Sequence, residues 1–506
     1  MNDTPRNTSG STALLALVGA SLPMNLDPAI HNIAVVGAGN ALHMTGTERS
    51  LAASIGTLCI AATILATGSL GDRWGRKKVM LLGLLVTLAG GVVTALAPSP
   101  ALFALGRALS GVGFAASFGL SFALLRTIAG SPQELARMVA KWLALQTFAI
   151  VILCVAGGYL AGISWRAAYL VGPLVGVLAL VWSFKAVPEA KDPDAGRFDG
   201  LGLVLVALGL VSALYAVSNA ASSGWDSARV LLPLAAGLAL LAAFGLWEWR
   251  SATPAFPIRS FTDPELMVGA MSGIAFNIGN AVVAIQLSLL WQYVYRYEPI
   301  EVSLGQLPFI VACIGAASWA GSLVAKGVSM RLLVPAGLLA MAAALAAMGF
   351  AGPSTPYWMF VVPLLVAGTG LMLTQTPTAN VFVAKPPPAL VGAVGSSRTA
   401  FGQFGFAFGL ALSSSLIYGM FNPLLRQRLA EAGATPGEQA QAIGILQAYV
   451  QTGNTDRFDA KMVHDVVASG IEAYLASYRI TMLIMAALIA VVAVLCFWLL
   501  PRRIAT

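Results

Sequence analysis

The sequence contains few charged residues. Asp, Glu, Lys and Arg make up 10% of the 506 residues, whereas hydrophobic residues make up 58%. A soluble globular domain typically carries about 25% charged residues, so the composition excludes an ordinary soluble protein. A helix needs roughly 20 apolar residues to cross a bilayer, and uncharged stretches of that length recur along the chain. The sequence therefore predicts an all-α polytopic membrane protein, because lipid offers no partner to an unpaired backbone amide.

Histidine and cysteine are also scarce, with three and four copies. Cys59, Cys154, Cys313 and Cys496 fall in different predicted spans without metal-ligand spacing, and we interpret them as small buried apolar residues. So few histidines and deep acids cannot supply a Ser-His-Asp triad, a metal cluster or a catalytic carboxylate pair. No G-x-x-x-x-G-K-[ST] motif for ATP is visible. We therefore expect no enzyme activity, no metal and no cofactor.

Fourteen membrane-spanning helices are predicted. Uncharged windows mark most of them, at 50–71, 79–106, 142–165, 201–225, 266–295, 302–325 and 480–501, with two more inside 332–384. The others lie near 12–36, 102–128, 164–184, 229–248 and 390–420. Pro23 and Asp27 interrupt the first span. Its weak cleavage context predicts that it is retained and is not a signal peptide.

The net charge of +8 is unevenly distributed over the predicted loops. If the N-terminus lies inside, the cytoplasmic loops carry most of the Lys and Arg residues. The short outer loops carry only Arg49, Arg229 and Arg296, with Arg166 at a span edge. This asymmetry follows the positive-inside rule and predicts that both termini are cytoplasmic. The excess of Lys and Arg is explained by the orientation of the protein in the membrane, so we expect no nucleic-acid partner.

The predicted spans divide into six, two and six. Pro, Gly and charged residues concentrate at 188–200 and 249–265, and we interpret both segments as cytoplasmic linkers. They separate a six-helix half at 1–187, an inserted helix pair at 201–248 and a second six-helix half at 266–506. Within the second half, we expect a long extracytoplasmic loop at 421–471. Repeated halves are typical of transporters, whose substrate site lies between them near the membrane midplane.

The densest run of charge, GDRWGRKK at 71–78, lies between predicted spans 2 and 3. The longer stretch GSLGDRWGRKK resembles the signature loop of the major facilitator superfamily, G-x-L-x-D-R-x-G-R-[RK]. Glycine permits close backbone approach and tight turning, and Asp72 can cap a neighbouring helix start or pair with arginine. A simple cytoplasmic anchor would not account for the Gly-Asp-Gly spacing. The resemblance implies a conformational latch made by Gly68, Asp72, Arg73, Gly75, Arg76 and Lys77.

Other stretches resemble the fourteen-helix drug:proton antiporters of the EmrB/QacA type. LDPAIHNIAV (26–35) is similar to their first-span motif, with Ala29 and His31 as departures. Four further stretches follow in the order of that branch: GRALSGVGFAASF (106–118), SWRAAYLVGPLVG (164–176), RFDGLGLVLVALGL (197–210) and WQYVYRYEPIEVSLGQLPF (291–309). The resemblance covers nearly the whole chain. It implies the major facilitator fold, with two six-helix halves and an inserted pair.

The fifth-span antiporter motif of that branch, G-P-x-x-G-G, is incomplete. It appears as LCVAGG at 153–158, where Gly157 and Gly158 remain but the Gly-Pro pair is absent. This motif accompanies exporters in the family. The missing Gly-Pro pair therefore weakens the inference to drug antiport but not the inference to transport.

Ionisable residues deep inside spans are functional candidates, because each costs about 2.5–3.5 kcal/mol on insertion scales. Asp27, Arg107 and Arg398 are the clearest, and Asp27 is the only deep carboxylate. The resemblance places the spans of Asp27 and Arg107 along one cavity. We expect Asp27 to be the proton-coupling acid and Arg107 its switchable partner; the alternative is a static structural ion pair. His31, one turn after Asp27, either joins a proton relay or is a hydrogen-bonded structural residue.

Several polar residues in the second half are candidates for the substrate cavity. Polar groups inside spans either join helices or line a transport path. Arg398 has no evident carboxylate partner in the sequence, and either a cavity-facing or a cytoplasm-facing position is consistent with it. The candidates are Asn277, Asn280, Gln286, Trp291, Gln375 and Arg398.

The sequence is best explained by a proton-coupled antiporter that exports small amphipathic or cationic compounds by alternating access. The expected partners are a small-molecule substrate, protons and the lipid bilayer, and we expect a monomer in the inner membrane of a bacterium. Two alternatives stay open. One is a dedicated exporter of a single metabolite or lipid, and the other is a non-transporting receptor or scaffold.

Overall fold

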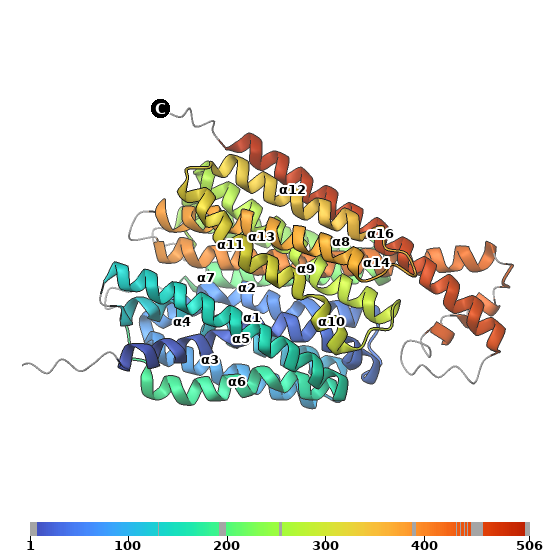
Figure 1. Cartoon of the computed structure of the whole chain (residues 1–506), viewed down its shortest axis with the longest axis horizontal. Helices are drawn as coiled ribbons and strands as arrows, with labels where there is room; N and C mark the ends of the chain where they lie inside the picture. The colour runs from blue at the N-terminus through green and yellow to red at the C-terminus, as the bar shows by residue number, and fades with distance from the viewer. Residues whose placement is uncertain are drawn as a thin grey trace, which may run out of the picture.

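The computed structural model describes residues 8–129, 131–191, 199–251, 256–386, 391–431 and 459–500, with short pieces between 433 and 446. These residues form a bundle of long α-helices whose axes run in broadly similar directions (Figure 1). No β-strand occurs among them. The predicted linkers and both chain ends fall partly or wholly on 1–7, 192–198, 252–255 and 501–506, outside the described residues.

The helices follow one another with short connections. The first group is α1 (Thr8–Ala41), α2 (Gly46–Trp74), α3 (Arg76–Leu96), α4 (Pro100–Ile128), α5 (Pro132–Ile163) and α6 (Trp165–Ala186). Next come α7 (Gly200–Ser223), α8 (Ala228–Arg250) and the short 3-10 helix η1 (Ile258–Thr262). The last group is α9 (Pro264–Tyr293), α10 (Pro299–Gly305), α11 (Leu307–Ala325), α12 (Met330–Met348), α13 (Trp358–Ala384), α14 (Val391–Glu431) and α16 (Ala460–Leu499).

Most of these helices meet the length and composition of a membrane span. Among the described residues, twelve helices do so, with α10 and α11 together counted as one. Helix α2 qualifies as a bent pair, Leu51–Ile64 and Ala66–Trp74, inclined at 49°, and the apolar part of α5, Phe148–Ile163, is shorter. The expected all-α membrane architecture is confirmed. The count of fourteen spans stays a prediction that depends on α2 and α5.

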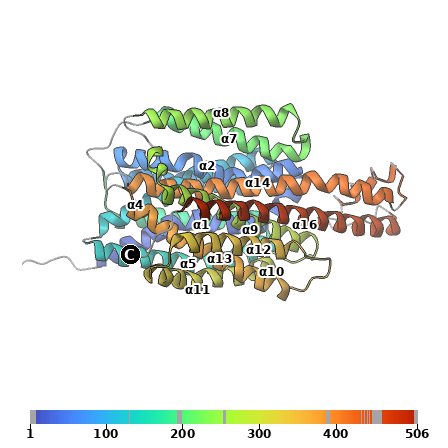
Figure 2. The ribbon, with the colours of Figure 1, turned by 90° about the horizontal axis from the view of Figure 1, so that it is seen from above.

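Residues 421–471 differ from the expected loop, because helices occupy both of its ends. Helix α14 continues to Glu431 and α16 begins at Ala460, and both extend beyond the rest of the bundle (Figure 2). An ion pair joins Arg428 of α14 to Glu472 of α16. Apolar side chains explain the difference, because they bury one another between the two helices: Leu425, Leu429, Ala442, Ile445, Val466 and Ala473.

The helices pack as two groups with the inserted pair at their side. Helices α1–α6 contact one another, as do α9–α14 with α16. Helix α7 packs against α2 of the first group and α14 of the second, while α8 packs on α7 at the edge of the bundle (Figure 2). The carboxylate of Asp199 fastens this pair, since it accepts hydrogen bonds from the Gly202 backbone at 2.9 Å and from Nε1 of Trp247 at 2.9 Å.

The two groups also meet at the predicted outer end of the bundle. Gly158 of α5 lies against Ser303 of α10, and a Cβ atom at position 158 would come within 3.1 Å of the carbonyl oxygen of Pro299. Arg49, on the first turn of α2, donates to the hydroxyl of Tyr293 in α9 at 2.8 Å and to Oδ1 of Asn40 in α1 at 2.9 Å. Arg49 therefore links both groups, and it lines a cavity between them.

Replacing Arg49 by Ala should loosen this outer contact. Hydrogen bonds from a charged group contribute about 1.5–3 kcal/mol each, so their loss should favour opening of the predicted outer end. We expect a cysteine at Ala53, a buried residue lining the same cavity, to react about tenfold faster with a membrane-impermeant maleimide in the Arg49→Ala variant. The four native cysteines are first replaced. Arg229→Ala, at an exposed arginine on the same predicted face, is the control, and equal rates in both variants would contradict the assignment.

Candidate functional site

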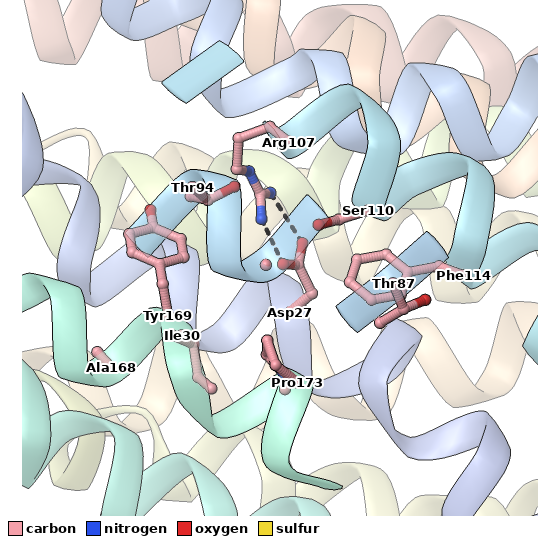
Figure 3. Close-up of a pocket in the computed structure, with 12 residues that line it drawn as sticks. Asp27, Ile30, Thr87, Thr94, Arg107, Ser110, Phe114, Ala168, Tyr169 and Pro173 are labelled. Carbon is pink, nitrogen blue, oxygen red and sulfur yellow. Dashed lines mark hydrogen bonds and ion pairs between the residues drawn. The ribbon is translucent and has the colours of Figure 1, made fainter. Parts of the chain in front are cut away.

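An ion pair between Asp27 and Arg107 lies inside the first group of helices (Figure 3). Asp27 is on α1, which continues through Pro23 and Pro28. Arg107 is on α4, about two turns from a start at which the Ser99 hydroxyl accepts from the backbone of Leu102. Both terminal nitrogens of Arg107 donate to the Asp27 carboxylate, one of them at 2.8 Å to Oδ2. The side chain of Arg107 is 2% exposed and that of Asp27 is 12% exposed, so the pair is largely shielded from solvent.

A small pocket with polar and apolar lining surrounds this pair. Helices α1, α3, α4 and α6 line it, and the hydroxyl groups of Thr94 and Ser110 lie near the pair (Figure 3). The Arg107 guanidinium also lies over the ring of Tyr169, 5.7 Å from the centroid, and its Nε has no hydrogen-bond partner among the described residues. A Cβ atom on Gly56 of α2 would lie 3.2 Å from an Arg107 nitrogen. The absence of a side chain at position 56 thus gives Arg107 room between α2 and α4.

His31 extends this cluster along α1. Its Nδ1 lies 2.6 Å from the hydroxyl of Tyr169, while its Nε2 is buried and has no hydrogen-bond partner in the part of the chain that the structure describes. Tyr169 therefore touches both His31 and Arg107. The structure brings together the three residues predicted for proton coupling, through a tyrosine that sequence reasoning did not select. The available signal was its place in SWRAAYLVGPLVG, one of the stretches that carry the family resemblance.

A second polar contact joins α1 to α5 and was also missed. Nε2 of Gln146 donates to the Ser21 hydroxyl at 2.5 Å, and Oε1 of Gln146 accepts from the side chain of Asn25. Gln146 is buried within the uncharged window 142–165. A lone amide in such a window is the signal that could have identified it.

The GDRWGRKK segment forms the junction of α2 and α3. Arg76 donates from Nε to Oδ1 of Asp72 at 2.7 Å. The start of α3 is capped by Glu189, whose carboxylate accepts from the backbone N–H groups of Lys77 at 2.9 Å and Lys78 at 3.2 Å. Asp72 was expected to cap a helix start or to pair with arginine, and the pairing is observed. The cap comes instead from a residue more than a hundred positions away, which the loop motif alone cannot reveal.

Two glycines of this segment have different environments. Gly75 has φ of 109°, and a Cβ there would lie 2.8 Å from the carboxylate of Glu189. A Cβ on Gly68 would meet nothing within 4 Å. Gly75 therefore makes a tight turn of the kind the motif implies, whereas Gly68 shows neither a positive φ nor a close approach. Arg73 lies on the last turn of α2, and Nζ of Lys77 donates to the carbonyl oxygen of Phe184 at 2.9 Å. A latch between the halves stays a prediction, because these contacts join the segment to residues 184–190.

Two of the predicted cavity residues are instead packed inside the second group. Trp291 is fully buried against Gly305, Tyr297, Tyr357 and Phe360. Gln286, also buried, donates to the hydroxyls of Ser413 at 2.9 Å and Ser414 at 3.1 Å. Trp291 is therefore a core residue, and Gln286 joins α9 to α14. The expectation that they line the cavity is wrong for this conformation, because neighbouring helices cover both side chains.

The other candidates are partly exposed within the bundle. Asn277 and Asn280 lie on α9, Gln375 on α13 and Arg398 on α14, and all four are half-buried. Asn277 donates to the carbonyl oxygen of Gly273 at 2.8 Å and lies beside Gly402. Nη2 of Arg398 donates to Oε1 of Gln375 at 2.8 Å. The structure thus brings Gln375 and Arg398 into contact. Asn277 of α9 lies beside Gly402, which is about one turn after Arg398 on α14.

The chain belongs to the Major Facilitator Superfamily, whose profile matches residues 13–410. It is a membrane-embedded transporter of small molecules and not an enzyme. The resemblance stated from the motifs is confirmed at this level. Solved structures agree on the fold: a bacterial homologue of the human lysosomal transporter Spinster has a TM-score of 0.69 at 13% identity, covering 98% of both chains. An auto-inhibited POT family peptide transporter has a TM-score of 0.62 at 16% identity, covering 98% of this chain and 97% of the other.

The curated relatives are named for resistance and export. Puromycin resistance protein pur8 of Streptomyces alboniger is 27% identical over 86% of each chain. Cephamycin export protein CmcT of Amycolatopsis lactamdurans is 28% identical over 81% of this chain and 85% of its own. Multidrug resistance protein Stp of Mycobacterium tuberculosis is 25% identical over 98% of this chain and 93% of its own. These relatives agree with the drug:proton antiporter branch that the motifs resemble.

The contrast between Gly75 and Gly68 gives a matched test of the α2–α3 junction. Gly75→Ala should lower the free energy of unfolding by about 1–3 kcal/mol, because it forces a non-glycine residue into positive φ and crowds Glu189. Gly68→Ala adds a methyl group in open space on a helix, where Ala is favoured over Gly by roughly 0.5–1 kcal/mol. The measurement is the heat-unfolding midpoint of each purified variant. Similar decreases of the unfolding midpoint in both variants would show that Gly75 is not required for the turn geometry.

Proposed function

We propose that this protein exports small amphipathic compounds across the bacterial cytoplasmic membrane in exchange for protons, with Asp27 as the coupling acid. The observation that carries the proposal is the bidentate contact between Asp27 and the buried Arg107. Resistance and export in the names of the relatives support outward transport. A proton moving inward releases about 2.3 kcal/mol per 100 mV, so no nucleotide site is required.

Protonation of Asp27 changes what holds α1 and α4 together. A carboxylate accepts from both nitrogens of a guanidinium, whereas a neutral carboxyl group has lost its charge and uses one oxygen as a donor. Arg107 is then a buried cation without its counter-ion, an arrangement that is strongly destabilising. The nearby hydroxyls of Thr94 and Ser110 offer neutral acceptors but no charge. The unpaired charge of Arg107 can therefore be compensated only if α1 and α4 move. This movement links proton binding to the alternation between inward-open and outward-open states.

Tyr169 and His31 hold the Arg107 guanidinium in position for this step. The Tyr169 ring packs on the guanidinium, and its hydroxyl is fixed by Nδ1 of His31. Arg107 thereby keeps a position from which Asp27 can be recaptured once its proton leaves. The small-molecule cargo, protons and lipid are the partners of this mechanism, and a monomer with cytoplasmic termini is sufficient for it.

Asp27→Asn should abolish proton-driven export while leaving the protein folded. The amide keeps the shape of the side chain but cannot carry a proton on and off, so we expect gradient-driven flux in proteoliposomes to fall by about tenfold or more. Exchange of labelled for unlabelled cargo, which needs no gradient, should persist. Asp226→Asn, at an exposed acid on the predicted outer face, should transport like the natural protein.

Two results would contradict the proposal. Wild-type flux that survives collapse of the proton gradient by an ionophore would exclude proton antiport. Flux at the natural rate in Asp27→Asn would leave antiport possible but remove Asp27 from its role.

A further inference from the structure

Arg398 is a cation inside the second helix group, and the described residues give it no acidic partner. It lies on α14, about two turns after the start of that helix at Val391. Helices α2, α7, α9, α13 and α16 all pack against α14. Arg107 pairs with Asp27 and Lys385 pairs with Asp263, but no ion pair of the described residues includes Arg398. Its hydrogen-bond partner among them is the neutral amide of Gln375.

The guanidinium of Arg398 can bind more than it does. It carries five N–H donors in a planar fork, and the described residues supply an acceptor for one, at Nη2. Its side chain is only half-buried, so part of it is accessible within the bundle. Such a fork matches the two oxygens of a carboxylate, which accepts two parallel hydrogen bonds. An arginine held among helices with spare donors and no counter-charge is suited to an anion that arrives from outside the protein.

An apolar surface begins beside this cation. Phe401 lies one turn further along α14, and the rings of Phe404 and Phe408 stack with centroids 5.8 Å apart. These three side chains pack against a cluster that includes Met24 of α1 and Leu58 of α2. The Phe401 ring also packs against Phe256 and Phe261, so the aromatic residues lie where α14 meets both η1 and the first helix group. A charged head at Arg398 and an apolar body along these rings describe an amphipathic anion.

We propose that Arg398 binds the carboxylate of an amphipathic cargo, with Gln375 holding the guanidinium in place. This inference rests on the proposed function and narrows its substrate class from amphipathic compounds in general to organic anions. It has an electrical consequence. Inward movement of a proton and outward movement of an anion both carry positive charge inward, so their exchange is driven by the membrane potential as well as by the pH difference. Exchange of one proton for one monovalent cation would be electrically neutral.

Binding of dansyl-phenylalanine and of its uncharged amide to the full chain in lipid nanodiscs tests the proposal. The two probes differ only in the carboxylate, and tryptophan-sensitised dansyl emission reports binding. We expect the natural protein to prefer the carboxylate by about tenfold, in line with a charge-assisted bidentate contact. Arg398→Gln should remove the preference and Arg398→Lys should keep part of it. Arg331→Gln, which removes a cation at the start of α12, should leave it unchanged.

Gln375→Glu is a second variant that keeps Arg398. It places a carboxylate on the residue that Arg398 already contacts, so the arginine gains an internal partner and the cargo carboxylate meets a competitor. The preference should again disappear, in a protein whose buried charge is now better balanced. A preference that persists in both Arg398→Gln and Gln375→Glu, or that is absent from the natural protein, would overturn the proposal.

Flux of the same probes separates this inference from the proposed function. In proteoliposomes, a potential imposed with potassium and valinomycin should accelerate export of the carboxylate more steeply than export of the amide. Proton-driven export of the amide without preferred binding of the carboxylate would overturn the role of Arg398 alone. Loss of gradient-driven flux for both probes would overturn proton antiport, while the nanodisc titration would still decide whether Arg398 binds anions.

Discussion

Burial of charge in a medium without water is the constraint on which this structure depends. Asp27 and Arg107 lie on helices α1 and α4, and neither is tolerable alone at membrane depth. Their bidentate contact compensates both buried charges while Asp27 is ionised. If the carboxylate is neutralised, Arg107 becomes an uncompensated buried cation. The same constraint explains why Tyr169 and His31 are arranged as they are. Each supplies a contact that orients Arg107 or its neighbour without adding a charge of its own.

The two helix groups treat buried charge differently. In the first, the cation is neutralised within the protein, beside a small pocket. In the second, the amide of Gln375 is the partner that the described residues offer Arg398, and aromatic side chains lie nearby. Under the proposals above, this asymmetry separates two tasks, because protons would act at Asp27 and the cargo would be recognised at Arg398. Competition between proton and cargo would then require a change of conformation and not a shared ligand.

The fold and the central ion pair were predictable because charge is conspicuous in an apolar sequence. Asp27, Arg107 and Arg398 are interruptions in otherwise uncharged stretches, and α1 and α4 bring the first two together. Residues whose roles depend on distant partners were not predictable. Glu189 looks like one more linker acid until the structure places it on the backbone of Lys77 and Lys78. Trp291 was a candidate for the substrate cavity, but the absence of a side chain at Gly305 lets that segment cover it.

Helix α14 gives this protein a mechanical property. Its 41 residues continue without interruption from Val391 to Glu431, through Pro423, and at 1.5 Å per residue they form a rod about 60 Å long. One end carries Arg398 and the other is clamped to α16 outside the bundle by Arg428 and by the apolar cluster around Leu425 and Leu429. Between these ends, Gln286 of α9 donates to the hydroxyls of Ser413 and Ser414, about midway between Arg398 and Arg428. A molecule that docks on the protruding end would therefore bind the same continuous helix that carries Arg398 about 45 Å away.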